Sequence, residues 1–489
     1  MFFTLFLICV HTTLAVANSD NEYNCVLCMN TIDLMKEKAA KFLDACNQFK
    51  FCSFNKDKFL SLTSTQINGA DSRVTCQLME ACPMDKIYSS SPAPYDIRVS
   101  KGFGSRGYDK IRISLISNTT VSAPGIFTYS APFKYRWTNN VLNTGVVSIT
   151  PGISTDFLIN GKNISISIPE DNAGVRGVII ADPCFQTQWV SCSYKDTFQT
   201  FDRMTSILNA IHDGHTDTHF WSILGDNFYD QSGEPTSTWF NALSLSTKTR
   251  IMGSFPGNHD IWVAGTPDSW TKKDQQANGF MQWYGQDVQA GTAGDVPYDF
   301  SVNPDVNPSA ENIPPAKNFF SYYKIGNIAI FGYSGAHSYE ETLPLFDEAC
   351  SWAQSANPGV ILLLGHWNSN GMGCETDMTV PNVYKELTSV PSCSSIAGKF
   401  KYVMGHTHSN VVVQKDIGFM VAGQGMSGSG DFGFPVFDST DSRFRIYYFS
   451  FATSGIFNAD SYNSILDCIA SKGVSACYSL ATLWVDTAI

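Results

Sequence analysis

Charge is scarce in this sequence of 489 residues. Only 16% of the residues are charged, well under the ~25% typical of soluble domains. Acidic residues outnumber basic ones by 44 to 32, which gives a formal net charge of −12. Nucleic acid and anionic membrane surfaces require clustered cations, so we expect neither as a general partner. No low-complexity run and no long apolar stretch follows the first residues, so we expect neither fibrous repeats nor a transmembrane segment.

The first 17 residues have the pattern of a secretory signal peptide. Residues 2–10 are apolar, and Ala15-Val16-Ala17 forms a small-residue cleavage site. The apolar run is too short to span a bilayer. We therefore expect a secreted or lysosomal protein that meets an oxidising compartment, where disulfides persist. Two N-x-S/T sequons, at Asn118 and Asn163, fit this route.

Cysteine is plentiful, with 14 in the chain. Six fall within one N-terminal stretch, at Cys25, Cys28, Cys46, Cys52, Cys76 and Cys82. Apolar residues between them recur at helical spacing, so we expect residues 18–90 to form a small helical module stapled by disulfides. The C-x2-C opening and C-x5-C closing resemble a saposin-type domain, which implies three disulfides and contact with lipid. A stapled helical module without a lipid role is the alternative.

After a linker, the composition and hydrophobic pattern of the sequence change twice. Residues 95–175 are rich in β-forming residues between turn signals, which predicts a β-rich domain. Residues 176–455 alternate short apolar strands with helical patterns, which predicts an α/β layered domain. The expected strands are 178–181, 221–224, 360–364 and 401–404, and the expected helices are 198–211 and 344–356. The segment 456–489 receives no assignment.

Polar side chains follow the ends of the predicted strands in the α/β layered domain. They are Asp182, Asp226, Tyr229, Asn258, His259, His366, His406 and His408. Ligands gather at strand ends in layered α/β folds, because the loops there are free to carry function. Carboxylates, a phenol, an amide oxygen and imidazoles are hard to borderline ligands. The pattern therefore favours metal, and one carboxylate can bridge two ions.

Four short motifs, GDNFY, GNHD, GHW and GHTH, together resemble the calcineurin-like metallophosphoesterases, and within them the purple (tartrate-resistant type) acid phosphatase branch. The resemblance covers about residues 176–425. It implies a β-sandwich flanked by helices and a centre of two metal ions. One ion would be held by Asp182, Asp226, Tyr229 and His408. The other would be held by Asp226, Asn258, His366 and His406, so that Asp226 bridges.

Tyr229 is the discriminating position in this resemblance. Most of the superfamily has a His of the first motif in that slot, whereas the first motif here reads Asp182-Pro183-Cys184. Two carboxylates and a phenolate favour a hard trivalent ion such as Fe3+ at the first site. The second site, with one shared carboxylate and neutral ligands, suits Fe2+, Zn2+ or Mn2+.

The resemblance implies a secreted or lysosomal acid phosphatase that acts on phosphomonoesters. Hydroxide generated by the two ions would attack phosphorus in line. His259 would protonate or steady the leaving alkoxide, or in the alternative only orient its neighbours. A sphingomyelinase-like phosphodiesterase, with the saposin-like module presenting lipid, is a second interpretation. A non-catalytic lipid-binding protein is a third.

Cysteine and histidine side chains elsewhere in the sequence have more than one possible role. Cys184 would either add a soft ligand to the first metal or pair with Cys192 in a disulfide. His212, His215 and His219 have a spacing that mimics a metal cluster, but their polar, turn-like context predicts a surface loop. His337 follows a predicted strand at 328–331 and is considered for the mouth of the site. Seven cysteines fall in the metal-bearing part, so at least one thiol there is free or paired between chains.

Overall fold

The computed structural model describes residues 28–29, 32, 75–77, 82, 86–90, 96–101, 107–119, 121–133, 140–184, 200–229, 234–261, 280, 284, 315–422, 432–453 and 456–489. The predicted signal peptide (1–17) lies outside these residues, and so does most of the predicted module at 18–90. Two described parts of that module are helical, and a disulfide between Cys28 and Cys76 joins them. The saposin-like architecture stays a prediction.

Two large β-sheets contain most of the described strands. In the first, ten described strands run in the order β20 (Thr482–Ala488), β17 (Arg443–Ser450), β16 (Gly433–Ser439), β7 (Arg176–Ile180), β8 (Phe220–Leu224), β9 (Ile251–Phe255), β1 (Asp96–Ser100), β2 (Lys110–Ser117), β4 (Asn140–Ser148) and β3 (Tyr129–Phe133). In the second, six described strands run in the order β10 (Ser321–Ile325), β11 (Ile328–Gly332), β12 (Val360–Leu364), β13 (Phe400–Met404), β15 (Gly418–Val421) and β14 (Asn410–Gln414). Two short hairpins pair β5 (Thr155–Ile159) with β6 (Lys162–Ile166) and β18 (Ala452–Thr453) with β19 (Ile456–Phe457).

The two sheets pack face to face. A Cβ at Gly332 of β11 would lie 1.7 Å from the Phe255 ring of β9, so only glycine at this position leaves room for the ring. A Cβ at Gly253 of β9 would likewise lie 2.6 Å from the Tyr323 hydroxyl of β10. Strands β7, β8, β9, β11 and β12 are almost wholly buried, as near-continuous apolar runs require when both faces are covered.

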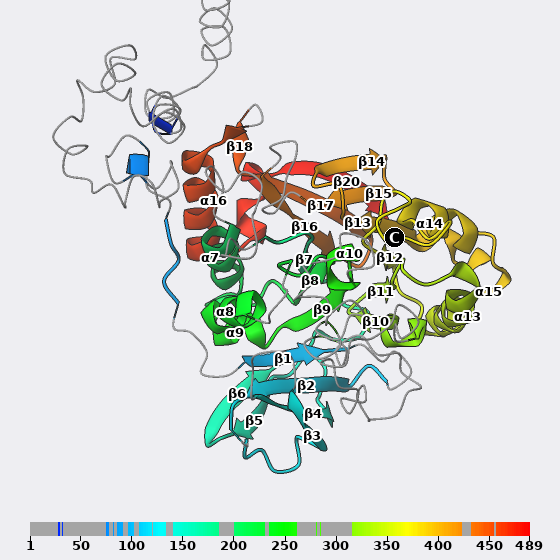
Figure 1. Ribbon diagram of the computed structural model, residues 1–489, viewed down its shortest axis with the longest axis horizontal. Coiled ribbons are helices and arrows are strands. Elements are labelled where there is room, and N and C mark those ends of the chain that lie inside the picture. The colour runs from blue at the N-terminus through cyan, green and yellow to red at the C-terminus, as the bar shows by residue number, and fades with distance from the viewer. Residues whose placement is uncertain are drawn as a thin grey trace, which may run out of the picture.

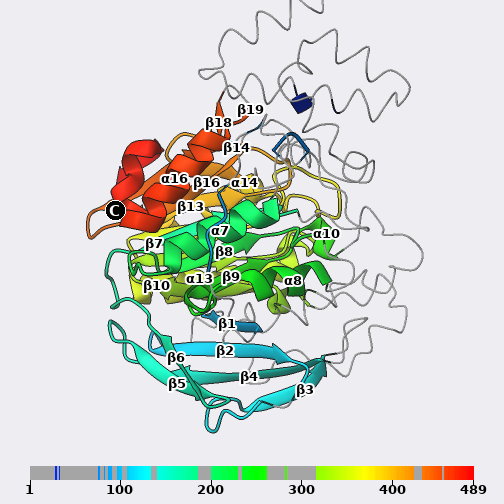
Figure 2. The same cartoon turned by 90° about the vertical axis from the view of Figure 1, so that its left-hand side faces the viewer.

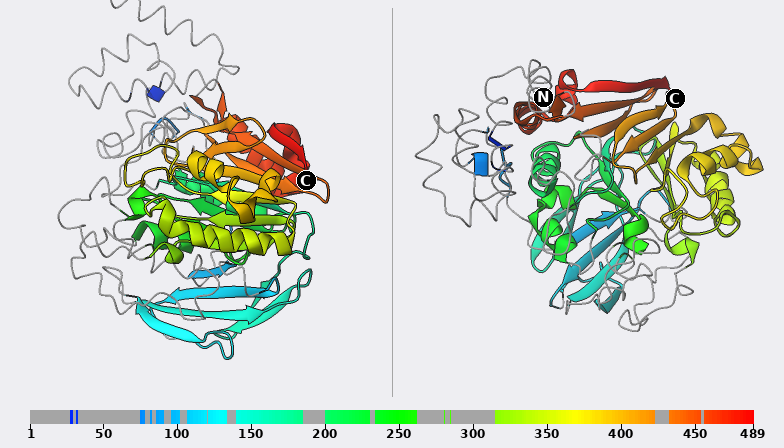
Figure 3. Two further views of the ribbon diagram at one scale, coloured as in Figure 1. Left: turned by 90° about the vertical axis from the view of Figure 1, so that its right-hand side faces the viewer. Right: turned by 45° about the horizontal axis from the view of Figure 1, so that its top comes forward.

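Helices cover the outer faces of the two sheets. On the outer side of the ten-stranded sheet lie α7 (Thr200–His212), α8 (Glu234–Ala242), α9 (Leu245–Lys248) and α16 (Ala459–Lys472). On the outer side of the six-stranded sheet lie α13 (Tyr339–Ala356), α14 (Val380–Leu387) and α15 (Pro391–Ser394). In Figure 1 and in the right-hand view of Figure 3 the strands lie between the green and the yellow helices, and Figure 2 shows the green helices in front of the strands. The remaining short helices are α10 (Asn258–Ile261), η4 (Ala316–Asn318), η5 (Ala397–Lys399) and η6 (Ser475–Leu480).

The predicted strands and helices of the α/β layered part are confirmed. Strands β7, β8, β12 and β13 occupy the expected positions, and α7 covers the described part of the expected helix at 198–211. Helix α13 begins five residues before the expected start at 344. Ser338 caps it by accepting a hydrogen bond from the Glu341 N–H, so Pro344 lies inside the helix instead of at its first position.

The ten-stranded sheet crosses both expected domain boundaries. Strand β1 pairs in parallel with β9 through Val99 and Ile251, so strands of the 95–175 region extend the sheet beyond β9. At the opposite edge, β20 pairs with β17, and α16 packs against α7. The segment after 455 therefore supplies an edge strand and a covering helix (Figure 1). The division into domains at 175 and 455 stays a prediction.

Disulfides fasten the periphery of the described fold. Cys350–Cys393 ties α13 to α15, and Cys468–Cys477 ties α16 to η6. Cys374 is a free thiol, as the odd cysteine count predicted. Within the described ranges, no helix combines the length and the apolar character that crossing a bilayer requires.

Candidate metal centre

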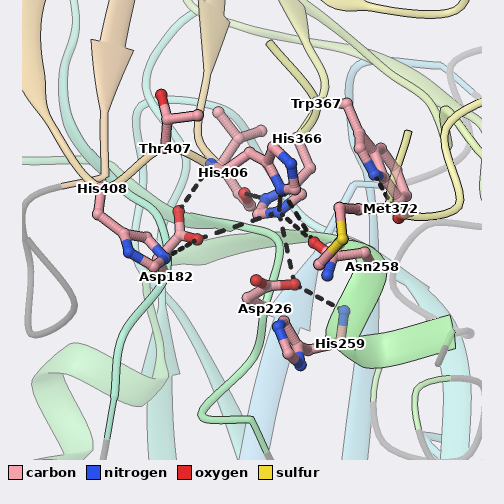
Figure 4. A network of polar contacts seen from close by, with 12 residues as sticks. Asp182, Asp226, Asn258, His259, His366, Trp367, Met372, His406, Thr407 and His408 are labelled. Atoms are coloured by element: carbon pink, nitrogen blue, oxygen red, sulfur yellow. Dashed lines mark hydrogen bonds and ion pairs between the residues drawn. The ribbon is translucent and has the colours of Figure 1, made fainter. Parts of the chain in front are cut away.

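The predicted ligands converge at one end of the two sheets. Asp182 follows β7, Asp226 follows β8, and Asn258 opens α10 after β9. From the facing sheet, His366 follows β12, and His406 and His408 follow β13. Strands β7, β8 and β9 run parallel, so their carboxyl ends meet at one edge. A hydrogen bond from the Ala181 N–H to the Val421 carbonyl, at 3.1 Å, joins the two sheets beside this point. Figure 4 shows the side chains that gather there, among them Asp182, Asp226 and His366.

One half of the centre surrounds the imidazole of His366. Its Nε2 lies 3.4 Å from Asp226 Oδ1 and 3.2 Å from Asn258 Oδ1. His406 Nδ1 lies 3.0 Å from the same Asn258 oxygen and 3.3 Å from His366 Nε2. The four predicted ligands of the second ion are therefore brought together. Asp226 and Asn258 are buried, and His366 is fully so.

The other half of the centre surrounds the carboxylate of Asp182. The Tyr229 hydroxyl donates to Asp182 Oδ1 at 3.3 Å and lies 3.0 Å from His408 Nε2. That His408 nitrogen lies 3.4 Å from Asp182 Oδ1. The ligand atoms of Asp182, Asp226 and His366 all lie within 4.8 Å of one another, so the two halves form one cluster.

Most of these residues have a left-handed backbone. Asp182, Asp226, Phe228, Tyr229, His406 and His408 have φ between 51° and 77°. Such a conformation is uncommon for residues other than glycine and costs on the order of 1–3 kcal/mol at each position. Strain of this kind gathers at functional sites, because the surrounding structure must hold it in place. Here it turns the ligand side chains of Asp182, Asp226, Tyr229, His406 and His408 sharply toward the cluster.

Three glycines next to the ligands leave room that a side chain would fill. A Cβ at Gly225 would lie 2.3 Å from His366 Nδ1, and one at Gly257 would lie 2.3 Å from Asp226 Oδ1. A Cβ at Gly405 would lie 2.7 Å from Asp182 Oδ2. These glycines therefore permit the close approach of ligands from neighbouring loops.

The ligand atoms of the site are mostly hydrogen-bond acceptors, which favours a bound cation. His366 Nδ1 lies 2.9 Å from the Leu224 carbonyl oxygen, which fixes it as the N–H donor. The Nε2 of a neutral His366 therefore directs a lone pair at the Asp226 and Asn258 oxygens, which are acceptors as well. Burial lowers the pKa of His366, but the Asp226 and Asp182 carboxylates outweigh burial and raise it to about 10. These residues fit a metal ion, which would supply the positive charge that the buried carboxylates require.

His259 and Asp260 lie just outside this ligand cluster. The His259 N–H donates to Asp226 Oδ1 at 2.9 Å, and the imidazole packs 4.6 Å from the Tyr229 ring. The Asp260 carboxylate accepts from the Gly257 N–H at 2.7 Å and from the Asn227 N–H at 3.1 Å. It thereby fastens the loop after β8 to the loop after β9. This positioning role was missed from the sequence, although Asp260 stands inside the GNHD motif.

The structure decides between the alternatives for Cys184 and for one of the histidines in HDGHTDTH. Cys184 is disulfide-bonded, so it is not a thiolate ligand, although Cys192 lies outside the described residues. The prediction of a surface loop for HDGHTDTH is wrong for His212, which is buried in the last turn of α7 with Nδ1 3.3 Å from Thr247 Oγ1. Burial lowers the pKa of His212 well below its ordinary value. His337 is buried against the Phe319 ring, with centroids 5.2 Å apart.

The fold and the site together define a layered α/β protein with a buried Asp/Asp/His cluster fit for metal. No protein-family model matches the chain, and no curated protein matches its sequence. Among solved structures, it is similar to a purple acid phosphatase from yellow lupin (Lupinus luteus) seeds, with 12% identity over 75% of this chain and 73% of that one and a TM-score of 0.49. It is also similar to PhoD, with 9% identity over 74% and 87% of the two chains and a TM-score of 0.40.

A dimetal phosphatase from Danio rerio is a third similar structure, with 9% identity over 56% of this chain and 95% of that one and a TM-score of 0.35. All three TM-scores lie below 0.5. These similarities therefore do not indicate the activity or the substrate of this chain.

Proposed function

We propose that the chain is a calcineurin-like metallophosphoesterase of the purple acid phosphatase type, which hydrolyses phosphomonoesters at a centre of two metal ions. One observation carries the proposal: carboxylate, phenol, amide and imidazole ligand atoms from five strand-end loops converge around Asp182 and Asp226. The four motifs that suggested the family supply all of them except Asp182, which follows the first strand of the series. The disulfides support a secreted or lysosomal location.

The chain's own residues have separable roles in this reaction. Asp182, Tyr229 and His408 would hold one ion, Asn258, His366 and His406 the other, and Asp226 would bridge. Ions bound there would lower the pKa of a coordinated water and offset charge on the phosphoryl oxygens. His259, held close to Asp226 by its own N–H, would give a proton to the leaving alkoxide. Asp260 would keep the loops of Asp226 and Asn258 in register.

We infer the identity of the metals from the acidity of the Tyr229 phenol. Burial raises the pKa of Tyr229 well above its ordinary value, and the Asp182 and Asp226 charges add to this effect. The phenol therefore gives up its proton only to a strongly polarising cation. We expect Fe3+ beside Tyr229 and Fe2+, Zn2+ or Mn2+ at the second position.

The test combines metal content, colour and turnover in the purified, oxidised protein. We expect two metal ions per chain, one of them iron, a visible charge-transfer band that Tyr229→Phe removes, and hydrolysis of p-nitrophenyl phosphate at acidic pH. A colourless protein that holds only zinc would refute the Fe3+ assignment. A metal-loaded protein that hydrolyses no phosphate ester would refute the proposed function and favour a non-catalytic role.

A phosphodiesterase is the second candidate. The disulfide between Cys28 and Cys76 joins two helical parts of the N-terminal module, which is the feature that favours a lipid-presenting unit. The phenol at Tyr229 favours the monoesterase, because the resemblance places a first-motif His in that slot in the other branches. Faster hydrolysis of bis-p-nitrophenyl phosphate or sphingomyelin than of p-nitrophenyl phosphate would reverse this order.

A further inference from the structure

Met372 is held in an unfavourable conformation and an unfavourable environment at the same time. Its side chain is 47% exposed, although it is large and apolar. Its φ is 52°, and the flanking Gly371 and Gly373 have φ of 96° and 82°. Three successive left-handed residues make a sharp projecting turn. A non-glycine residue in this conformation is uncommon, and backbone strain of this kind clusters at functional sites.

The turn that projects Met372 is anchored at its base. The indole Nε1–H of Trp367 donates to the Met372 carbonyl at 3.1 Å. The Cys374 N–H donates to the Gly371 carbonyl at 3.0 Å and closes the turn. Trp367 itself is buried, and a Cβ at Gly335 would lie 2.7 Å from its ring, so the indole is packed tightly. The position of Met372 is therefore fixed through a rigid side chain.

The same side chain connects the turn to the metal centre. Trp367 follows the ligand His366 directly, and the two rings meet edge to face with centroids 5.3 Å apart. The next residue, Asn368, donates from Nδ2 to Thr407 Oγ1 at 2.8 Å, between the ligands His406 and His408. In Figure 4 the Met372 side chain extends from the Trp367 side toward Asn258.

Other exposed large apolar residues in the described part of the chain lack this connection. The segments that carry no ligand hold Ile87, Ile153, Leu158, Leu480 and Leu483. Val411 and Val413 are exposed on β14, an edge strand where an alternating pattern accounts for them. Met372 is distinguished by the combination of exposure, backbone strain and attachment to a ligand-bearing loop.

We propose that Met372 is a specificity-determining residue that contacts an apolar leaving group of the phosphate ester. The inference rests on the proposed function and deepens it, since it names aryl and other apolar monoesters as the preferred substrate class. The metal ligands would contact the phosphoryl group and would not discriminate between one leaving alcohol and another. A thioether is flexible and polarisable and makes favourable contacts with aromatic rings, so it suits an apolar alcohol of variable shape.

The kinetic test compares 1-naphthyl phosphate with glycerol 2-phosphate in the wild type, Met372→Asn and Met372→Leu. Asn tolerates the left-handed backbone but removes the apolar contact, whereas Leu retains it. We expect Met372→Asn to lower kcat/KM for the naphthyl ester about tenfold, the loss typical of one apolar pocket contact. The glycerol ester should change little, and Met372→Leu should keep the preference. Leu480→Asn is the matched control, because Leu480 is 45% exposed on η6.

A binding test separates the inference from the proposed function. Benzylphosphonate and methylphosphonate are not hydrolysed, and their Kd values report only recognition. We expect the wild type to bind the benzyl compound more tightly and Met372→Asn to lose that difference. An equal loss of kcat/KM for both esters, or a wild-type preference retained in Met372→Asn, would overturn the inference. If the wild type hydrolyses no ester, the proposed function fails, and equal Kd values for the two phosphonates would then overturn the role of Met372 independently.

Discussion

The structure predicts a pH effect on stability at His219, which lies at the amino ends of the strands and far from the metal ligands. His219 Nδ1 accepts a hydrogen bond from the Arg176 N–H at 3.1 Å, so this nitrogen carries no proton in the folded protein. Burial, and then the positive charges of Arg250 and Arg176, lower the pKa of His219 to about 4, while Asp217 acts in the opposite direction. Protonation would break the hydrogen bond and add a third positive charge to those of Arg250 and Arg176.

The sign and size of the effect follow from these two pKa values. The folded pKa of about 4 lies below the ordinary value of 6.5, so the unfolded chain binds the proton more tightly. Stability is therefore complete above pH 6.5 and falls as the pH drops toward 4. At about pH 4.5 the loss from this one group amounts to roughly 2.5 kcal/mol. The lowered pKa of His212 acts in the same direction.

The assay is urea unfolding followed by tryptophan fluorescence at pH 7.0 and pH 4.5. His219→Asn keeps an acceptor for the Arg176 N–H but cannot titrate, so the difference in unfolding free energy between the two pH values should shrink by about 2.5 kcal/mol. His215→Asn is the matched control from the same loop. The His215 Nε2–H donates to the Ala470 carbonyl, so His215 is a donor where His219 is an acceptor. An unchanged pH difference in His219→Asn would refute the reasoning.

Three further substitutions test the metal centre and the sheet packing. Asp226→Ala removes the bridging carboxylate, so metal analysis should find both ions lost and turnover should fall below about 1% of wild type. Gly225→Ala places a Cβ 2.3 Å from His366 Nδ1, and we expect reduced metal occupancy with the protein still folded by circular dichroism. Gly332→Ala drives a Cβ to 1.7 Å from the Phe255 ring, and overpacking should lower the free energy of unfolding by about 1–3 kcal/mol. Full occupancy in either of the first two variants, or unchanged stability in the third, would contradict the geometry.

The candidate site could be predicted from the sequence because its information is local. Each ligand stands within a few residues of an apolar strand, and parallel strands place their carboxyl ends together. Asp182, Asp226 and Asn258 therefore come together although they are far apart in sequence. The role of Asp260 was not predictable in this way, because its partner Asn227 belongs to another loop and their hydrogen bond depends on the exact offset of two turns.

The wider fold depends on contacts that no local pattern encodes. The parallel pairing of Val99 with Ile251 joins segments about 150 residues apart, and nothing in the alternation of β1 indicates a neighbour in the α/β layered part. His212 was misjudged for a related reason. Its polar neighbours resemble a loop, but the last turn of α7 points the imidazole at α9, where Thr247 contacts it. Composition describes a segment, whereas burial depends on what packs against it.

The left-handed ligands have a consequence for how this chain can vary. Because Asp226 and Tyr229 each depend on a reversed backbone turn, one deleted residue within GDNFY would rotate the ligands that follow it away from the metals. An insertion between motifs, where the loops leave the strand ends, changes no such turn. GDNFY and GHTH therefore each act as a single unit of turn and ligand. Insertional scanning of the gene should give inactive clones within these two motifs and active clones of many lengths between the motifs.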